Sequence, residues 1–133
     1  MQEIIMAIMA IDWGRKRMGL AYMNDIHGII FPLWSLDNNA DVLYSIAHFV
    51  MQHKATKILV GYPSQQAWVQ KSIDNFIKQL SFVISPDCPI VKVNEDYSSI
   101  QANAMIWVYK KTAEEDSLAA VCLLEEWKKN SVV

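Results

Sequence analysis

The stretch AIDWGRKRMGLAY, residues 10–22, places a single acid between a long apolar run and a basic turn. Asp12 directly follows the run IIMAIMAI, and three consecutive cations begin one residue after Gly14. A carboxylate at the end of a buried strand costs free energy unless it is paired or holds a metal ion. The stretch therefore predicts a buried strand ending in an acid with a chemical role. The alternative is an Asx-type turn in which Asp12 only shapes the chain before Gly14.

The residues on either side of this stretch predict a three-stranded meander. Strands are expected at residues 4–12, 18–23 and 28–36. Gly14 and the pair Asn24-Asp25 supply the turns between them. Connections this short join antiparallel neighbours, so the three strands should lie side by side in chain order.

Beyond residue 38 the apolar residues recur at helical spacing, and two short apolar runs interrupt the helices. Helices are expected at residues 39–53, 67–80, 98–110 and 112–129, with strands at 57–61 and 89–93. Asn38 or Asn39 is the expected cap of the first helix. Strands connected through helices should be parallel, with right-handed crossovers. The order βββαβαβαα predicts an α/β fold, a mixed five-stranded sheet with helices on both faces, which is the ribonuclease H-like arrangement.

Length and composition are those of one globular domain covering residues 1–133. The chain is 53% hydrophobic, and its first apolar run is too short to cross a bilayer. We therefore expect a cytoplasmic protein without a membrane segment, in which Cys88 and Cys122 are free thiols. The net charge of −2 weakens a nucleic-acid-binding hypothesis without excluding it, because local basic patches remain possible.

Two further acids stand where an apolar or neutral residue is usual. Glu95 follows the predicted strand PIVKV, and functional groups of open α/β sheets gather just beyond the carboxyl ends of strands. Asp116 shares a helix face with Ala120 and Leu123 by three-and-four spacing. The alternatives are that Glu95 stabilises the start of the next helix and that Asp116 interacts with the helix dipole.

Three carboxylates near one edge of one sheet would repel each other strongly without a cation. Mg²⁺ and Mn²⁺ resolve this repulsion because both prefer hard oxygen ligands. Two such ions about 4 Å apart can activate a water and stabilise the leaving oxygen of a phosphodiester. The sequence therefore predicts a Mg²⁺ or Mn²⁺ site with Asp12, Glu95 and Asp116 as ligands.

Several motifs together resemble one family. The segment DWGRKRMGLAY resembles the opening D-x-G-x-K-R-I-G-V-A of the YqgF family, also called RuvX. The segments IIFPLWSL, ILVGYP, NEDYSSIQA and EDSLAAVCLLEEW are similar to later family motifs, in the family's order. The resemblance covers essentially the whole chain.

The resemblance implies a divalent-metal-dependent endonuclease with catalytic acids at Asp12, Glu95 and Asp116. Its nucleic-acid partner would be precursor 16S ribosomal RNA, trimmed at the 5′ end, or branched DNA, as in a Holliday junction resolvase. Lys16 and Arg17 match the family's basic pair and would contact phosphates, unless they are only a solvated turn. Gln65 and Ser98 are further candidate nucleic-acid contacts.

The chain departs from the family pattern at three points. Asn94 stands where Asp is common, Asp96 stands where Arg is common, and the loop after Pro63 is short. Gln65, Gln66 and Trp68 in that segment are candidate replacements, although Trp68 is expected to pack in the core. These departures motivate an alternative function, a non-catalytic RNA- or ribosome-associated module.

A third hypothesis is an ATP-binding protein of the actin-like class. Asp12, Gly14 and Gly19 fit its first phosphate motif, D-x-G-x-x-x-x-G. Such proteins close two similar domains around the nucleotide, whereas 133 residues supply one. No exposed stripe indicates a strong self-interface, so we expect a monomer or a weak homodimer.

Overall fold

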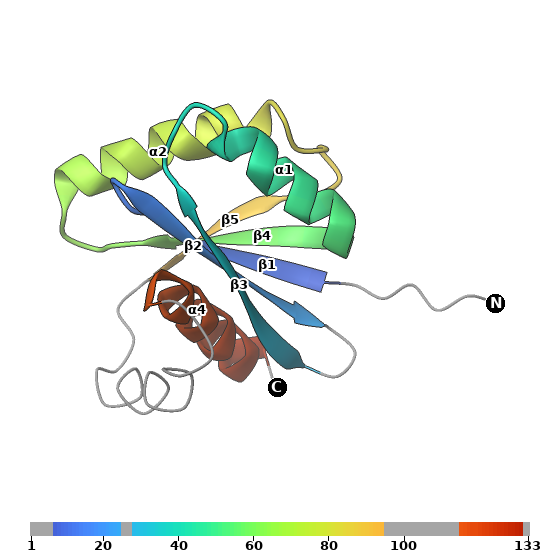
Figure 1. Cartoon of the computed structure of the whole chain (residues 1–133). Helices are drawn as coiled ribbons and strands as arrows, with labels where there is room; N and C mark the ends of the chain where they lie inside the picture. Colours follow the sequence, from blue (N-terminus) through green and yellow to red (C-terminus); the bar gives the residue numbers. More distant parts are fainter. Residues whose placement is uncertain (1–6, 25–27, 95–114, 132–133) are drawn as a thin grey trace.

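Five strands form one mixed sheet in the order β3-β2-β1-β4-β5 (Figure 1). The computed structural model describes residues 7–24, 28–94 and 115–131. β1 (Ala7–Asp12), β2 (Arg17–Asn24) and β3 (Ile29–Asp37) are antiparallel neighbours, while β4 (Ala55–Tyr62) runs parallel to β1 and β5 (Ile90–Asn94) parallel to β4. The predicted α/β fold with its mixed five-stranded sheet is confirmed.

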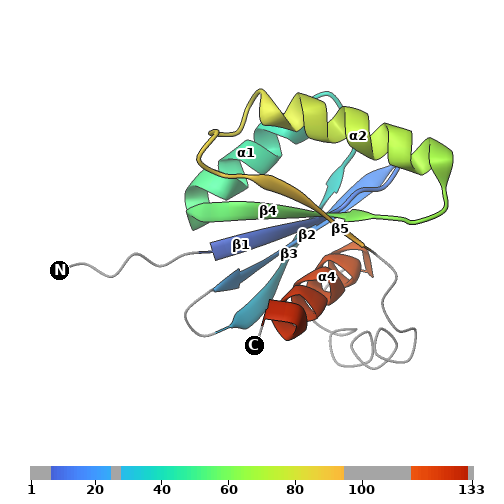
Figure 2. The same ribbon diagram turned by 180° about the vertical axis from the view of Figure 1, so that it is seen from behind.

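The three described helices lie on opposite faces of this sheet. α1 (Val42–His53) and α2 (Ala67–Ser81) cover one face, and α4 (Glu115–Ser131) covers the other (Figures 1 and 2). No described helix is both long enough and apolar enough to span a membrane. The helix predicted at 98–110 and residues 4–6 of the first predicted strand lie outside the described residues.

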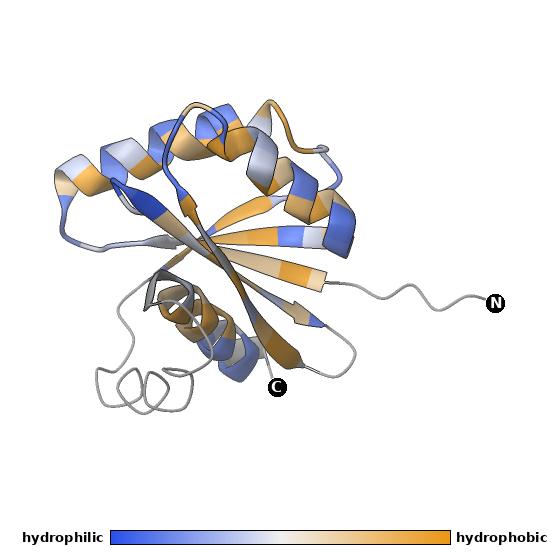
Figure 3. Ribbon diagram, in the orientation of Figure 1, coloured by the Kyte–Doolittle hydropathy of each residue, from blue (hydrophilic) through white to orange (hydrophobic). Residues whose placement is uncertain are grey.

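Strand β1 separates the two halves of the core because its side chains alternate between the faces. Met9 and Ile11 belong to the buried cluster beneath α1 and α2. Ile8 and Ala10 belong to the cluster beneath α4. All four are buried, and the apolar colouring of the strands in Figure 3 reflects this two-sided covering. Ala10 is small, which lets α4 approach the sheet closely.

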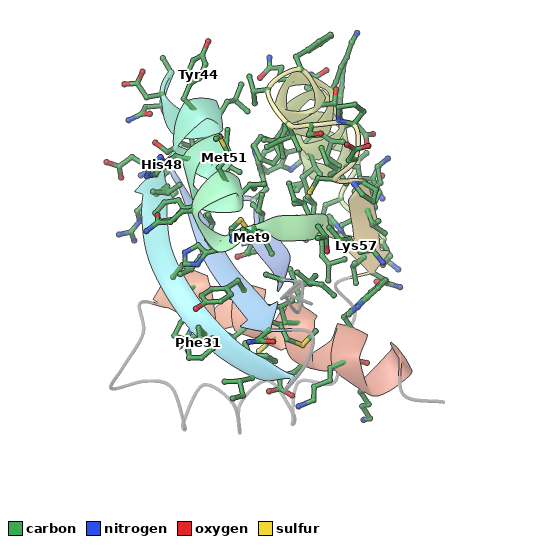
Figure 4. The ribbon with its side chains drawn as sticks, turned by 90° about the vertical axis from the view of Figure 1, so that its right-hand side faces the viewer. Met9, Phe31, Tyr44, His48, Met51 and Lys57 are labelled. Carbon is green, nitrogen blue, oxygen red and sulfur yellow. The ribbon has the colours of Figure 1, made fainter. Side chains whose placement is uncertain are left out.

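Stacked aromatic rings attach the end of α1 to β2 and β3. The Tyr22 ring lies 5.0 Å from the Phe31 ring and 4.3 Å from the His53 ring, centroid to centroid. Figure 4 shows Phe31 on β3 below α1, which carries Tyr44, His48 and Met51. Burial in this stack lowers the pKa of His53 from its ordinary value. The last turn of α1 is thereby fixed over the meander.

The outer strand β3 pairs with β2 through an irregular register. The pairing shifts between Gly19 and Ala21, and Pro32 is the partner of Ala21. β3 has a neighbour on one side only within the described sheet. A proline has no N–H to donate, so it is tolerated at such an edge.

The predicted cap of α1 is wrong. The helix begins at Val42, not at residue 39, and its cap residue is Asp41, which makes no side-chain cap hydrogen bond. Asn39 Oδ1 instead accepts a hydrogen bond from the backbone N–H of Asp41 at 3.0 Å. The asparagines belong to the loop between β3 and α1, where Asn38 has another partner described below.

Candidate active site

Asp12 is the last residue of β1, the central strand of the sheet, and it is half-buried. By strand alternation its side chain follows Ile8 and Ala10 onto the face covered by α4. The pKa of the Cys122 thiol on α4 is raised to about 11, by burial first and then by the negative charges of Glu125 and Asp12. The Asp12 carboxylate is therefore near enough to α4 for its charge to act there.

The start of α4 lies at the same end of the sheet as Asp12. The buried Ser117 hydroxyl donates a hydrogen bond to the Leu33 carbonyl of β3 at 2.8 Å. Ser35 lies two residues beyond Leu33 on β3, and its register partner on β2 is Gly19. Gly19 is in turn the register partner of Asp12 on β1. The backbone of Asp116, the second residue of α4, is thus placed at the edge where β1 ends.

The other two parallel strands also end at this edge. β4 ends at Tyr62, whose register partner is Asn94, the last residue of β5. Val91 and Val93 pack against the cluster beneath α4. Glu95 and Ser98 follow in the sequence but lie outside the described residues, as does the side chain of Asp116. The structure brings together Asp12 and the backbone of Asp116, and the three-acid site itself stays a prediction.

The basic turn between β1 and β2 is exposed and tightly folded. Arg15, Lys16 and Arg17 are all exposed. A side chain at Gly14 is excluded, because its Cβ would collide with the carbonyl oxygen of Arg17. Lys16 and Arg17 are therefore presented to solvent beside the end of β1, where a nucleic-acid backbone can reach them.

Asn38, in the loop after β3, holds this turn in place. This contact with the turn was not predicted from the sequence. Its side-chain Nδ2 donates to the Gly14 carbonyl at 2.9 Å, and its backbone N–H donates to the Lys16 carbonyl at 2.8 Å. The local sequence shows a polar residue shortly after a strand, a pattern that also fits a helix cap.

The segment between β4 and α2 presents polar and aromatic side chains to solvent. Gln65 is exposed, as a nucleic-acid contact must be. Trp68 is 59% exposed, so its predicted core packing is wrong. The buried stripe of α2 consists of Ile73, Phe76 and Leu80, and Trp68 in the first turn lies off that stripe.

The donor chemistry at this edge fits a hard divalent cation. The Asp12 carboxylate offers oxygen ligands, which Mg²⁺ and Mn²⁺ prefer. Among the described residues no group of three or more His, Cys, Asp or Glu side chains is placed to hold a metal ion. The other two predicted ligands have side chains outside that part of the chain.

A family model described as "RuvX: Holliday junction resolvase" matches residues 6–130. The chain belongs to the RuvX family. The family predicted from the sequence motifs is thereby confirmed. The match spans Asp12 and the basic turn as well as the segments that contain Glu95 and Asp116.

Relatives of this RuvX chain come from several bacteria. A protein of Chlorobium phaeobacteroides is 30% identical over 138 residues, covering 96% of this chain and 94% of the relative. A protein of Helicobacter pylori is 30% identical over 131 residues, covering 90% and 93%. Both are named "Putative pre-16S rRNA nuclease".

Two solved structures with a similar fold are complexes with Holliday junctions. The Fowlpox virus resolvase in complex with Holliday junction DNA gives a TM-score of 0.66 at 12% identity, over 96% of this chain and 99% of that one. The structure "T. thermophilus RuvC in complex with Holliday junction substrate" gives a TM-score of 0.63 at 10% identity, over 96% of this chain and 98% of that one. At these identities the likeness concerns the fold alone, and it confirms the ribonuclease H-like prediction.

Proposed function

We propose that this RuvX chain is a divalent-metal-dependent endonuclease that trims the 5′ end of precursor 16S ribosomal RNA. The observation that carries the proposal is the place of Asp12, at the carboxyl end of the central strand, on the α4 face and beside an exposed basic turn. The name shared by the bacterial relatives supports ribosomal RNA as the substrate. Membership of the family favours a nuclease over an actin-like ATP-binding protein.

The residues take distinct roles in this proposal. Asp12, Glu95 and Asp116 hold Mg²⁺ or Mn²⁺, which when bound activates a water and stabilises the leaving oxygen of the phosphodiester. Lys16 and Arg17 hold the phosphates on the solvent side of the turn. Gln65 and Ser98 add polar contacts to the nucleic acid. The half-buried position of Asp12 fixes its carboxylate, so that a ligand to the cation is oriented before the substrate arrives.

We further propose that residues 1–133 form one domain that acts in the cytoplasm as a monomer or weak homodimer. Trimming an RNA end needs a single active site. Symmetric cutting of a four-way junction would need two sites related by a dimer axis. The substrate preference and the oligomeric state are therefore linked in this proposal.

The test compares cleavage of end-labelled precursor 16S ribosomal RNA with cleavage of a four-way DNA junction, in Mg²⁺ or Mn²⁺. We expect metal-dependent cutting of the RNA. Asp12→Asn, which keeps the side-chain shape but removes the charge, should slow it on the order of 100-fold or more, since even outer partners of metal ligands contribute 10–100-fold. The matched control is Asp87→Asn, an exposed acid in the connection between α2 and β5.

The other outcomes separate the alternatives. Cutting of the junction in preference to the RNA would support a Holliday junction resolvase. Absence of cutting by a folded protein that still binds Mn²⁺ would support the non-catalytic RNA- or ribosome-associated module. Equal activity of Asp12→Asn and wild type would overturn the assigned role of Asp12.

A further inference from the structure

A recess opens at the same edge of the sheet, on the face covered by α1 and α2. It has a volume of about 350 Å³ and lies between the turn after β1, the loop after β3 and the side of α2. We call it the amide pocket, after the amide side chains in its lining, which includes Trp13, Asn39, Ser72, Asn75, Phe76 and Gln79 beside apolar residues at the start of α1. Over residues 7–24, 28–94 and 115–131, no charged side chain lines it. Its size is at the lower end of the range for small-ligand pockets.

The polar groups of the amide pocket come mainly from one face of α2. Ser72, Asn75 and Gln79 follow at helical spacing, so their side chains point the same way. The Ser72 hydroxyl donates to the Trp68 carbonyl. Within the described part of the chain the amides of Asn75 and Gln79, both exposed, are engaged by no hydrogen bond. Each offers both a donor and an acceptor to a ligand.

This lining matches a nucleobase better than a phosphate. Phosphates are held by cations and by backbone N–H groups, and the described residues that line the amide pocket include no cation. A base instead requires an aromatic face for stacking and side chains that both donate and accept hydrogen bonds. Trp13, which is only partly buried, supplies the aromatic face, while the core residue Phe76 closes the floor of the pocket. Asn75 and Gln79 supply the amides.

The amide pocket and the candidate active site are joined through consecutive residues. Asp12 faces α4, whereas Trp13 packs against the cluster beneath α1 and α2. The exposed turn that carries Arg15 and Lys16 follows immediately. A polynucleotide that crosses this edge of the sheet can therefore place a phosphate at Asp12 and a neighbouring base beside Trp13.

We propose that the amide pocket binds one unpaired nucleobase of the RNA whose scissile phosphate lies at Asp12. The inference rests on the proposed nuclease function and adds the substrate feature that the enzyme requires. An RNA whose bases near the cleavage site are all paired would not fill the amide pocket, since a paired base is stacked inside its helix.

The experiment measures binding separately from cleavage. Fluorescein-labelled single-stranded RNA spanning the maturation site is titrated with protein in the presence of a chelator, and the anisotropy gives the Kd. A matched series of RNAs carries one abasic nucleotide at each position in turn. The protein variants are Asn75→Ala/Gln79→Ala and a control, Gln52→Ala, which removes an exposed amide on α1 outside the amide pocket. Alanine is a strong helix former, so both variants should fold.

We expect wild type and Gln52→Ala to bind about tenfold more weakly when one particular base is absent, as base stacking on an aromatic side chain implies. Asn75→Ala/Gln79→Ala should bind the intact RNA more weakly and lose less affinity than wild type when the same base is removed, because only the stacking on Trp13 then remains to be lost. Two results would overturn the inference. One is that wild type binds every abasic RNA with the same Kd. The other is that removing the base weakens binding by the same factor in Asn75→Ala/Gln79→Ala as in wild type.

Cleavage of the precursor is then measured with the same proteins, which separates this inference from the proposed function. Cutting by wild type without any base dependence of binding would reject the amide pocket and leave the nuclease standing. Base-dependent binding that is lost in the double variant, from a protein that cuts nothing, would support the amide pocket and reject the nuclease.

Discussion

Among single residues, Gly14 and Asn38 determine the shape of the basic turn. The Gly14 carbonyl accepts the Asn38 side chain, while the space around its Cα is closed by the Arg17 backbone. A turn held from both sides presents Lys16 and Arg17 in one fixed arrangement. The affinity for a phosphate backbone should therefore depend on a residue that carries no charge.

Gly14→Ala tests this dependence. The added methyl group must displace the Arg17 carbonyl, so we expect a loss of about 1–3 kcal/mol in the free energy of unfolding. RNA affinity should fall as well, because the turn moves. The measurements are urea denaturation and anisotropy titration. Arg15→Ala, an exposed neighbour, should leave stability nearly unchanged. A Gly14→Ala protein as stable as wild type would contradict this account.

Local sequence predicted some of these residues and not others. Asp12 stood out because an acid ends an apolar run, and Gly14 because it precedes a basic turn. The role of Asn38 depends on a partner 24 residues away, which no local pattern reveals. The exposure of Trp68 was predictable in principle, because the buried stripe of α2 does not include it.

Among the elements, α1 ends in a conformation that its sequence does not favour. Lys54, the residue after the helix, has φ of 54° and ψ of 45°, the left-handed region. Its backbone N–H bonds to the carbonyls of Met51 and Val50, which closes the helix end. Glycine is the usual residue at such a position because it has no Cβ to clash.

Lys54→Gly should therefore raise the free energy of unfolding by about 1 kcal/mol. The matched control is Gln52→Gly, two residues earlier inside the helix, which should lower it by about 1 kcal/mol. Urea denaturation of both variants measures the change in the free energy of unfolding, which should be positive for Lys54→Gly and negative for Gln52→Gly. A decrease in both proteins would show that Lys54 makes a stabilising contact that outweighs its backbone strain.

The existence and type of the elements were predictable, whereas their ends were less so. Helical spacing identified α1 and α2, and short turns identified the meander. α1 begins at Val42 because the loop before it uses Asn38 and Asn39 for its own hydrogen bonds. Such competition between a side chain and a helix start is decided by tertiary contacts that lie elsewhere in the sequence.

In the molecule as a whole, one sheet divides the core into two layers. Each layer holds a buried cysteine, Cys88 below α2 and Cys122 on α4. Both thiols are free, as the sequence predicts. Burial raises the pKa of each, to about 11 for Cys122. At about pH 8 the reactive thiolate should therefore be scarce in the folded protein.

The two thiols test whether the layers unfold as one domain. In Cys88→Ala and Cys122→Ala, which leave one thiol each, reaction with an aromatic disulfide reagent should be slow. The rate of labelling should be the same in the two variants, because one shared unfolding event exposes both thiols. Both should react rapidly in concentrated urea. Faster labelling of Cys122 in native buffer would show that α4 opens alone, contrary to a single cooperative domain.

The sheet order followed from the sequence because short connections and right-handed crossovers leave few arrangements. The family followed from motifs spread along the whole chain. The assembly of the three acids stays a prediction: helical spacing places Asp116 on the face of Ala120 and Leu123, whereas Glu95 lies beyond the end of its strand, where no period fixes a side-chain direction. Asp12 was the exception, because strand alternation alone assigns it to the face of α4.

The irregular pairing of β3 bears on how this protein behaves at high concentration. An outer strand with a regular row of backbone groups is a template on which another chain can add a strand and start an aggregate. Pro32 has no N–H to donate to an added strand, and the register shift beside it interrupts the regular geometry that such pairing needs. We therefore expect crowded solutions of this chain to resist growth of intermolecular sheets from β3.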